Sequence, residues 1–331
     1  MSYIKDLVSV VIPTYKRNDM LPRAIESVLH QSYNDIEILV VNDNERQDDD
    51  YSKKLYEIIN NRNDPRIRLI QQEKHINGAA ARNAGIREAK GEYISFLDDD
   101  DYWELSKVET QVKVLKSLDE TWGAVTCLNI LRKGDQVISA DIPYSDGNIL
   151  IAILERRIGI GMGAALFRRS ALDQSGYFDE LLTRHQDLQL FAQVSSRYKI
   201  RLVKQYLYNI DTSDSKNRPT PEKLQRVKKE YYSSITNILQ GLTEGQRKII
   251  FALNNFEIAY AYLKSGNRKE SFILASEVLK SPKACYLSLE RCIRKYCARR
   301  FKNRLLSKYG YTKQKQGFNN VYNHNGRIPQ D

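Results

Sequence analysis

Short apolar runs alternate with amphipathic stretches through residues 1–215, and this alternation constrains the fold more than any other feature of the chain. The predicted strands are Val8–Ile12, Ile36–Val41, Ile67–Gln71, Tyr93–Leu97, Gly123–Leu131 and Gln136–Ala140. The predicted helices are Asn18–His30, Tyr51–Asn61, Asn77–Ala89 and Glu104–Ser117. Continuous apolar runs separated by helical periodicity are typical of βαβ units around a buried parallel sheet. The sequence therefore predicts an α/β fold, Rossmann-like, with a mostly parallel sheet flanked by helices.

Charge divides the chain into two regions. Residues 216–331 contain 24 Lys and Arg against 8 Asp and Glu, a net charge of +16, whereas residues 1–215 contain 28 against 33, a net charge of −5. The boundary falls in the polar, proline-bearing stretch 213–221, which has the composition of a linker. We therefore predict an α/β domain over 1–215, a basic and mainly α-helical region over 216–309, and a polar tail over 310–331 that is expected to be disordered.

Composition limits the location and the redox state. The chain has 331 residues and contains no run of about 18 apolar residues, and its first residues lack the apolar segment of a signal peptide. Its four cysteines, Cys127, Cys285, Cys292 and Cys297, form no CxxC pair and have no histidine at metal-ligand spacing. The expected protein is cytoplasmic, with reduced thiols and neither a zinc site nor a disulfide framework.

Four consecutive aspartates, Asp98–Asp101, follow the apolar run Tyr93–Leu97 directly. Carboxylates at the rim of a core repel one another, and each unpaired one is costly in a low dielectric. A hard divalent cation such as Mg²⁺ or Mn²⁺ would suit these oxygen ligands. The alternative is a solvated acidic turn that caps the helix beginning near Glu104, and the run alone leaves both possibilities open.

Polar clusters follow all four of the first predicted strands. They are Pro13–Tyr15, Asn42–Asn44, Glu73–Gly78 and Asp98–Asp101. Open α/β sheets bind ligands outside the carboxyl ends of their strands, so these clusters are expected to converge there, although each alone is also an ordinary turn or cap. The phosphate-binding patterns GxGxxG and GxxxxGK[ST] do not follow the first strand. A metal that bridges a diphosphate to the aspartates would neutralise the phosphate charge in place of such a loop.

Several motifs carry a resemblance to a known family. They are Val8–Tyr15 (VSVVIPTY), Ile38–Asp43 (ILVVND), Ala81–Ile86 (ARNAGI) and Gly91–Asp101 (GEYISFLDDDD). In this order and spacing they resemble the family 2 glycosyltransferases, which have a GT-A fold, and the resemblance extends from about residue 7 to about residue 210. It implies a nucleotide-diphosphate sugar as donor, usually UDP-linked, with Mn²⁺ or Mg²⁺ as cofactor and inversion at the anomeric carbon.

The resemblance also implies roles for individual donor-side residues. Those assigned to the donor nucleotide are Pro13, Thr14, Tyr15, Asp43 and Arg82. Among them, Asp43 is expected to accept a hydrogen bond from the uracil ring.

The metal motif is read as Asp98-x-Asp100. Asp100 is then a direct ligand, Asp98 a second metal-side carboxylate, and Asp98 or Asp99 holds the ribose or a metal-bound water. A shift by one residue is the alternative, since the whole run is aspartate.

A base must deprotonate the acceptor hydroxyl. The segments Gly163–Ser170, Gly176–Glu180 and His185–Leu190 resemble the acceptor half of the family, and Asp187 takes the aspartate position of its Glu-Asp pair. A carboxylate there could simply cap a helix, but the resemblance implies that Asp187 is the catalytic base. Gln186 replaces the usual glutamate.

Two histidines bear on this assignment. His185 could compensate for the missing glutamate, although a position at the start of the helix is the ordinary alternative. The family's late metal-binding histidine has only His324 as a candidate, in the polar tail, so no third metal ligand is assigned.

The basic region has its own pattern. Helices are predicted over 223–240, 246–264 and about 283–308, and the third is amphipathic and cationic. One interpretation is a helix packed on the transferase domain with a solvated charged face. The other is attachment to an anionic membrane surface, on the inner face of the cell membrane, where a polyprenyl-linked acceptor would be found. No recognition motif supports nucleic-acid binding.

The predicted function is an inverting transfer of sugar from a nucleotide-diphosphate donor, UDP-hexose or UDP-N-acetylhexosamine, to a hydroxyl of a surface-polysaccharide or lipid-linked glycan. One alternative is a nucleotidyltransferase, which would need a glycine-rich loop with a basic residue after the first strand, where this chain has Pro13–Arg17. The other is an inactive transferase-like binding module, against which the presence of Asp100 and Asp187 argues.

Overall fold

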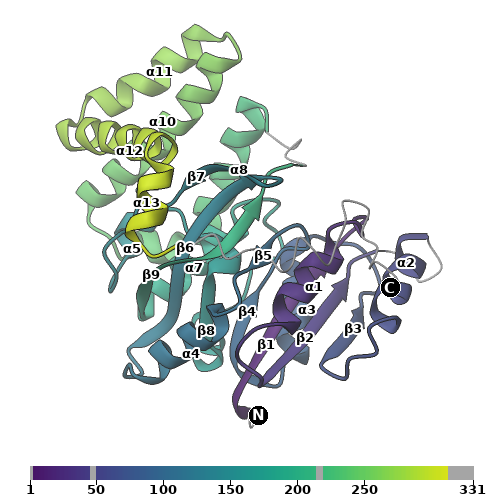
Figure 1. Ribbon diagram of the computed structural model, residues 1–331. Helices are drawn as coiled ribbons and strands as arrows, with labels where there is room; N and C mark the ends of the chain where they lie inside the picture. Colours follow the sequence, from purple (N-terminus) through teal and green to yellow (C-terminus); the bar gives the residue numbers. More distant parts are fainter. Residues whose placement is uncertain (1–2, 45–49, 214–218, 312–331) are drawn as a thin grey trace.

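The computed structural model describes residues 3–44, 50–213 and 219–311, which fold around a single nine-stranded sheet (Figure 1). The strand order is β3-β2-β1-β4-β8-β6-β9-β5, with β7 paired to β6. The strands are β1 (Ile4–Thr14), β2 (Ile36–Asn42), β3 (Ile67–Gln71), β4 (Gly91–Phe96), β5 (Tyr102–Trp103), β6 (Trp122–Lys133), β7 (Gln136–Ala140), β8 (Ala165–Arg168) and β9 (Lys199–Asp211). The predicted α/β fold class is confirmed.

The first half of the sheet is the predicted parallel unit. Strand β1 lies between β2 and β4 and pairs with both in parallel, so that Val10 is opposite Ile38 on one side and Ser95 on the other. All residues of β2 are buried. Strands buried on both faces require apolar residues throughout, which is why these strands were visible in the sequence as continuous runs.

The second half mixes directions. Strand β8 is antiparallel to both β4 and β6, while β9 runs parallel to β6 and carries the short strand β5 on its other edge. Strands β5, β8 and β9 were not among the strands predicted from the sequence. These strands matter for the site because β9 ends beside the aspartate run, where Tyr102 pairs with Asn209.

Helices cover the sheet on both faces. In the α/β part they are α1 (Leu21–Leu29), α2 (Asp50–Asn60), α3 (Gly78–Glu88), α4 (Lys107–Lys116), α5 (Leu150–Leu154), the 3-10 turn η1 (Met162–Ala164), α6 (Arg169–Ser175) and α7 (Gln186–Arg197). The side chain of Asn77 caps α3 by accepting from the N–H groups of Ala79 and Ala80. A Cβ at Gly85 would lie 2.3 Å from Val11 Cγ1, so glycine is what lets α3 lie directly on β1.

The basic region is helical and packs on the sheet. It contains α8 (Pro221–Ser234), α9 (Thr236–Gln240), α10 (Glu244–Lys264), α11 (Arg268–Leu279), α12 (Pro282–Arg300) and α13 (Lys302–Lys308). The predicted single helix over 283–308 is interrupted at Phe301. Beyond it, Leu306 joins a buried cluster with Leu128 and Ile130 of β6, and Lys302 Nζ donates to the Val137 carbonyl at 2.6 Å.

Three sequence-based expectations bear on the rest of the chain. All four cysteines are free thiols. Within the described ranges, no helix combines the length and apolar character needed to cross a membrane. The proposed domain boundary at residue 215 and the tail beyond residue 311 lie outside the described residues, so the domain limits stay a prediction.

Candidate active site

The aspartate run forms a turn at the carboxyl end of β4, in which the Asp101 N–H donates to the Asp98 carbonyl at 3.1 Å. Oxygens of Asp98, Asp100 and Asp101 lie within 4.8 Å of one another, so these three carboxylates could hold one metal ion. A compact group of carboxylate oxygens fits Mg²⁺ or Mn²⁺. The two predicted metal-side residues are brought together, and Asp101 joins them.

Two residues of β9 hold the Asp101 side chain in place. The Tyr208 hydroxyl donates to Asp101 Oδ2, and the N–H of Asp211 donates to Asp101 Oδ1 at 2.9 Å. Burial and the neighbouring carboxylates raise the pKa of Asp101 well above its usual range. A Cβ at Gly163 would lie 2.5 Å from the Tyr208 ring, so the glycine of η1 leaves room for the ring that fixes Asp101.

Arg17 partly neutralises Asp99 and Asp100. Arg17 donates to Asp99 at 2.9 Å and to Asp100 at 2.6 Å. Burial nevertheless raises the pKa of Asp99 to about 7, and burial also raises the pKa of Asp100 against the opposing effect of Arg17. Asp99 is not part of the group formed by Asp98, Asp100 and Asp101, and its other oxygen accepts a hydrogen bond from Thr14 Oγ1 at 2.8 Å. A cation at Asp100 would therefore compete with Arg17 for that carboxylate.

The predicted nucleoside side lies beside this group. Pro13 and Thr14 end β1, and the Tyr15 ring stacks on His75 with the ring centroids 3.7 Å apart. His75 Nδ1 lies 2.8 Å from Asp43 Oδ2. Burial raises the pKa of Asp43, and His75 opposes that shift. The loop that contains His75 was predicted to lie at this edge, but no role was predicted for His75 itself. Its contacts with Tyr15 and Asp43 depend on the fold.

Arg82 joins the donor side to the acceptor side. Its Nη2 donates to Asp98 Oδ1 at 2.5 Å, and its Nη1 lies 3.4 Å from Gln186 Oε1 at the start of α7. The next residue along, Asp187, is partly exposed in the first turn of the same helix. Asn83 tightens this junction, since its side chain donates to Glu180 Oε1 at 2.8 Å. The predicted base thus lies at a helix start that is linked to Asp98 through Arg82.

His185 is not placed to act as a spare acid or base. It precedes α7 in a left-handed conformation, with φ of 62°, and its ring packs edge-on against Tyr231. Burial, reinforced by the charges of Lys228 and Arg156, lowers the pKa of His185 to about 3. It is therefore neutral at physiological pH. It occupies the position just before α7, which is the ordinary alternative given above for this histidine.

A Rossmann-like sheet with converging carboxylates at its strand ends and a second, mixed half is the architecture of a GT-A glycosyltransferase. The sequence pattern of the family "Glycosyl transferase family 2" matches residues 9–176, about half of the chain. The chain belongs to this family.

Relatives in sequence carry the same activity in their names. An uncharacterised glycosyltransferase of Rickettsia felis is 32% identical over 210 residues, which are 63% of this chain and 34% of the relative. The UDP-Glc:alpha-D-GlcNAc-diphosphoundecaprenol beta-1,3-glucosyltransferase WfaP of Escherichia coli is 37% identical over 112 residues, 34% of this chain and 42% of WfaP. The amylovoran biosynthesis glycosyltransferase AmsB of Erwinia amylovora is 26% identical over 215 residues, 62% of this chain and 70% of AmsB. The chain thus spans only about a third of the length of the Rickettsia relative.

Solved structures share the fold. S. aureus TarS 1–349 in complex with UDP-GlcNAc has a TM-score of 0.59 at 17% identity, over 90% of this chain and 92% of that one. The mannosyltransferase PcManGT from Pyrobaculum calidifontis, in complex with GDP-Man and Mn²⁺, has a TM-score of 0.54 at 18% identity, over 92% and 84%. The resemblance extends into the helical region, since both alignments cover nine-tenths of the chain. The predicted GT-A fold is confirmed.

Proposed function

We propose that this chain transfers a sugar, with inversion, from UDP-hexose or UDP-N-acetylhexosamine to a hydroxyl of a surface-polysaccharide or lipid-linked glycan. The observation that carries the proposal is the contact made by Arg82. Arg82 contacts both Asp98, one of the three carboxylates that could hold a metal ion, and Gln186, the neighbour of Asp187. The proposed donor residues and the proposed base would therefore lie close together. Family membership favours this function over a nucleotidyltransferase and over an inactive binding module.

The proposed donor site consists of the nucleoside side and the metal side. Pro13, Thr14, Tyr15 and Asp43 would line the nucleoside, with Arg82 and Asp99 near the ribose and phosphates. Asp98 and Asp100 would hold Mn²⁺ or Mg²⁺, with Asp101 completing the group whose oxygens lie within 4.8 Å. A metal bound there would neutralise the charge that develops on the departing diphosphate.

The proposed base is Asp187. Its carboxylate would accept the proton of the acceptor hydroxyl while that oxygen forms a bond to the anomeric carbon and the bond to the UDP oxygen breaks on the opposite face. The names of WfaP and AmsB support an acceptor of this kind, because one names a diphosphate-linked lipid glycan and the other a polysaccharide. The amide of Gln186 would orient Arg82 rather than carry charge.

Donor binding tests the first half of this proposal. A UDP-sugar with Mn²⁺ should raise the melting temperature, because a ligand present at 100 times its dissociation constant stabilises the native state by about 2.7 kcal/mol. The measurement is a thermal-shift panel of UDP-sugars, with GDP-mannose as the comparison and EDTA in a parallel series. Indifference to every UDP compound in the presence of Mn²⁺ and Mg²⁺ would refute the proposed donor class.

Helix α12 is the proposed contact with an anionic membrane surface. One of its faces is packed, with Ala284, Leu287 and Ser288 buried. A second stripe is exposed and apolar, and it consists of Tyr286 (67% exposed), Leu289 (61%), Ile293 (52%) and Tyr296 (61%). The spacing places these four side chains on one helix face, within a region whose net charge is +16. Exposed apolar side chains on a cationic helix suit the interface of an anionic bilayer.

The double variant Leu289→Gln, Ile293→Gln tests this contact. Burial of a Leu or Ile side chain contributes about 1.5–3 kcal/mol, so the variant should lower the affinity for anionic vesicles at least about tenfold. Co-sedimentation with vesicles of anionic lipid measures it. Ile4→Gln is the matched control, because Ile4 is also exposed, at 53%, and begins β1, which lies far from α12 (Figure 1). Equal binding by the double variant and the wild-type protein would leave α12 as a packing helix only.

A further inference from the structure

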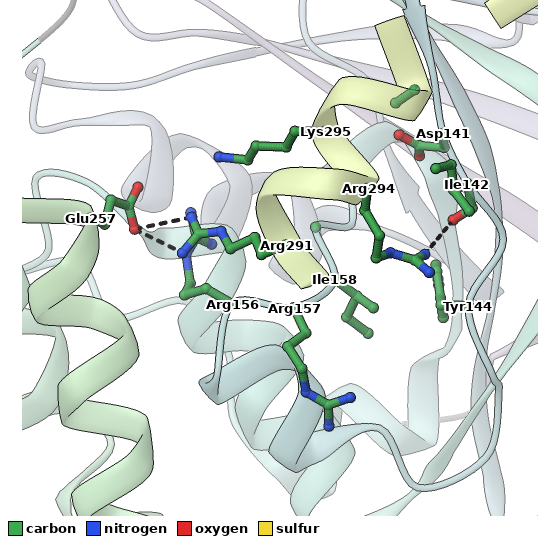
Figure 2. A pocket seen from close by; sticks show the side chains of 12 residues that line it. Asp141, Ile142, Tyr144, Arg156, Arg157, Ile158, Glu257, Arg291, Arg294 and Lys295 are labelled. Carbon is green, nitrogen blue, oxygen red and sulfur yellow. Dashed lines mark hydrogen bonds and ion pairs between the residues drawn. The ribbon is translucent and has the colours of Figure 1, made fainter. Parts of the chain in front are cut away.

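A cavity of about 280 Å³ lies between the helical region and the transferase part, and none of the four aspartates Asp98–Asp101 lines it (Figure 2). Its walls are α10, α12, the segment Asp141–Tyr144 that follows β7 and the segment Arg156–Gly159 that follows α5. The uncharged part of the lining comes from Ile142, Tyr144, Ile158, Gly159 and Ala298, and the remainder is charged. None of the residues assigned above to donor, metal or base lines it.

The charge of the lining is strongly positive. The cations are Arg156, Arg157, Arg291, Arg294 and Lys295, and the carboxylates are Glu257 and Asp141. Arg157 is paired outside the lining with Glu155, at 2.6 Å, and Arg294 donates to the carbonyls of Ile142 and Pro143. Glu257 Oε2 is shared, since it lies 3.6 Å from Arg156, 3.6 Å from Arg291 and 3.0 Å from Lys228. Burial raises the pKa of Asp141 to about 7, which reduces its share of negative charge. The protein's own carboxylates therefore do not balance the cations that face this cavity.

Two of these cations still have donors to offer. Arg156 Nε is buried and makes no hydrogen bond in the part of the chain that the structure describes; its ion-pair partner is the shared Glu257 carboxylate, at 3.6 Å. Lys295 extends from α12 toward Arg156 and Glu257 (Figure 2), and no ion pair or hydrogen bond is recorded for its ammonium among the described residues. Buried donors are normally satisfied, so a buried Nε without a hydrogen bond, next to an exposed ammonium without an ion pair, leaves room for a further anionic acceptor.

The cavity also lies close to the acceptor side of the active site. Arg156 and Glu257 are near enough to His185 to influence its pKa, and His185 is two residues before Asp187. Arg156 and Asp187 both act on the buried Tyr231, which packs against His185. The cavity therefore lies on the same side of the molecule as the start of α7, which carries the proposed base.

We infer that this cavity binds the phosphate or diphosphate group of the acceptor. Guanidinium groups favour phosphate oxygens because they donate in pairs with matching geometry, and three arginines and a lysine converge here from two separate parts of the chain. The inference rests on the proposed function and deepens it, since it assigns the acceptor's anionic group to Arg156, Arg291, Arg294 and Lys295. The lining residues of α12 lie on the face opposite its exposed apolar stripe, so α12 could contact a membrane and line the cavity at the same time.

Titration with inorganic pyrophosphate tests the cavity by itself. The protein is the full chain in EDTA, and calorimetry is run with and without saturating UDP. We expect saturable binding that UDP does not displace and that Lys295→Gln weakens about tenfold, the effect of losing one charge-assisted hydrogen bond. Lys283→Gln is the matched control, because it removes the same charge from an exposed position in the first turn of α12. Displacement by UDP, or equal effects of the two variants, would overturn the inference.

Two acceptors distinguish a lipid-linked diphosphate from a free phosphate. The same glycan is offered on a polyprenyl diphosphate and on a plain alkyl chain without phosphate. Lys295→Gln should raise KM about tenfold for the first acceptor and leave KM for the second unchanged. An unchanged KM for the diphosphate acceptor would overturn the inference. Failure to transfer to either acceptor would count against the proposed function, while the pyrophosphate titration would still decide whether the cavity binds phosphate.

Discussion

Asp187→Asn is expected to lower kcat by about 10²–10⁴-fold, the usual contribution of a positioned general base. The amide keeps the size of the carboxylate but cannot take the proton of the acceptor hydroxyl. Donor binding should be nearly unchanged, because Asp187 lies at the start of α7 and the proposed donor residues lie on β1, β2, α3 and the turn after β4. Initial rates of UDP release in the presence of acceptor, with calorimetric titration of the UDP-sugar, measure the two quantities separately.

The control is Asp135→Asn. Asp135 is exposed in the turn between β6 and β7, so this variant repeats the chemical change outside the proposed site and should keep wild-type rates. A kcat for Asp187→Asn within a few-fold of the wild-type value would show that another group accepts the proton. A parallel loss of UDP-sugar affinity would instead place Asp187 on the donor.

The parallel half of the fold was predictable because its strands are buried on both faces. Such strands need an apolar residue at nearly every position, and the runs at β1, β2 and β4 have this pattern. Strand β9 has no such run: its sequence KIRLVKQYLYNID alternates buried and exposed positions and carries charges. Strand β5 is two residues long and exists only through its pairing with β9. Tertiary contacts decide both, so no local pattern predicts them.

The site was predicted incompletely because β9, which was not predicted, holds part of it in place. The family resemblance predicted that Asp98 and Asp100 belong together, as the two carboxylates of the metal motif. It could not show that Asp101 joins them, because Tyr208 and Asp211 of β9 hold that side chain in place. Asp99 leaves the group for a similar reason, its partner Thr14 being 85 residues away in the chain.

The cationic cavity depended on still longer-range contacts. Arg156 and Glu257 meet Arg291 only after α10 and α12 have packed against the segment that follows α5. The sequence showed a region of net charge +16, which predicts an anionic partner but not where that partner binds.

Asp100→Asn is expected to lower the rate at a fixed Mn²⁺ concentration by about 10²-fold or more, the scale of losing one group that stabilises developing charge. An amide oxygen still accepts from Arg17 but supplies no negative charge to a cation. The Mn²⁺ concentration needed for half-maximal rate should therefore rise steeply. Asp99→Asn is the informative comparison, because Asp99 faces Thr14 and Arg17 and lies outside the three-carboxylate group. That variant should leave the Mn²⁺ activation midpoint in place, whatever it does to kcat.

Stability distinguishes loss of the metal from loss of the fold. Burial and the charge of Asp98 both raise the pKa of Asp100, so the metal-free folded protein disfavours the ionised carboxylate there. A neutral amide removes that cost, and in EDTA the melting temperature of Asp100→Asn should be no lower than that of the wild-type protein. With Mn²⁺ and UDP added, the order should reverse, because only the wild-type carboxylates gain a cation to hold. A variant whose melting temperature rises with Mn²⁺ and UDP as much as that of the wild-type protein would exclude Asp100 as a metal ligand.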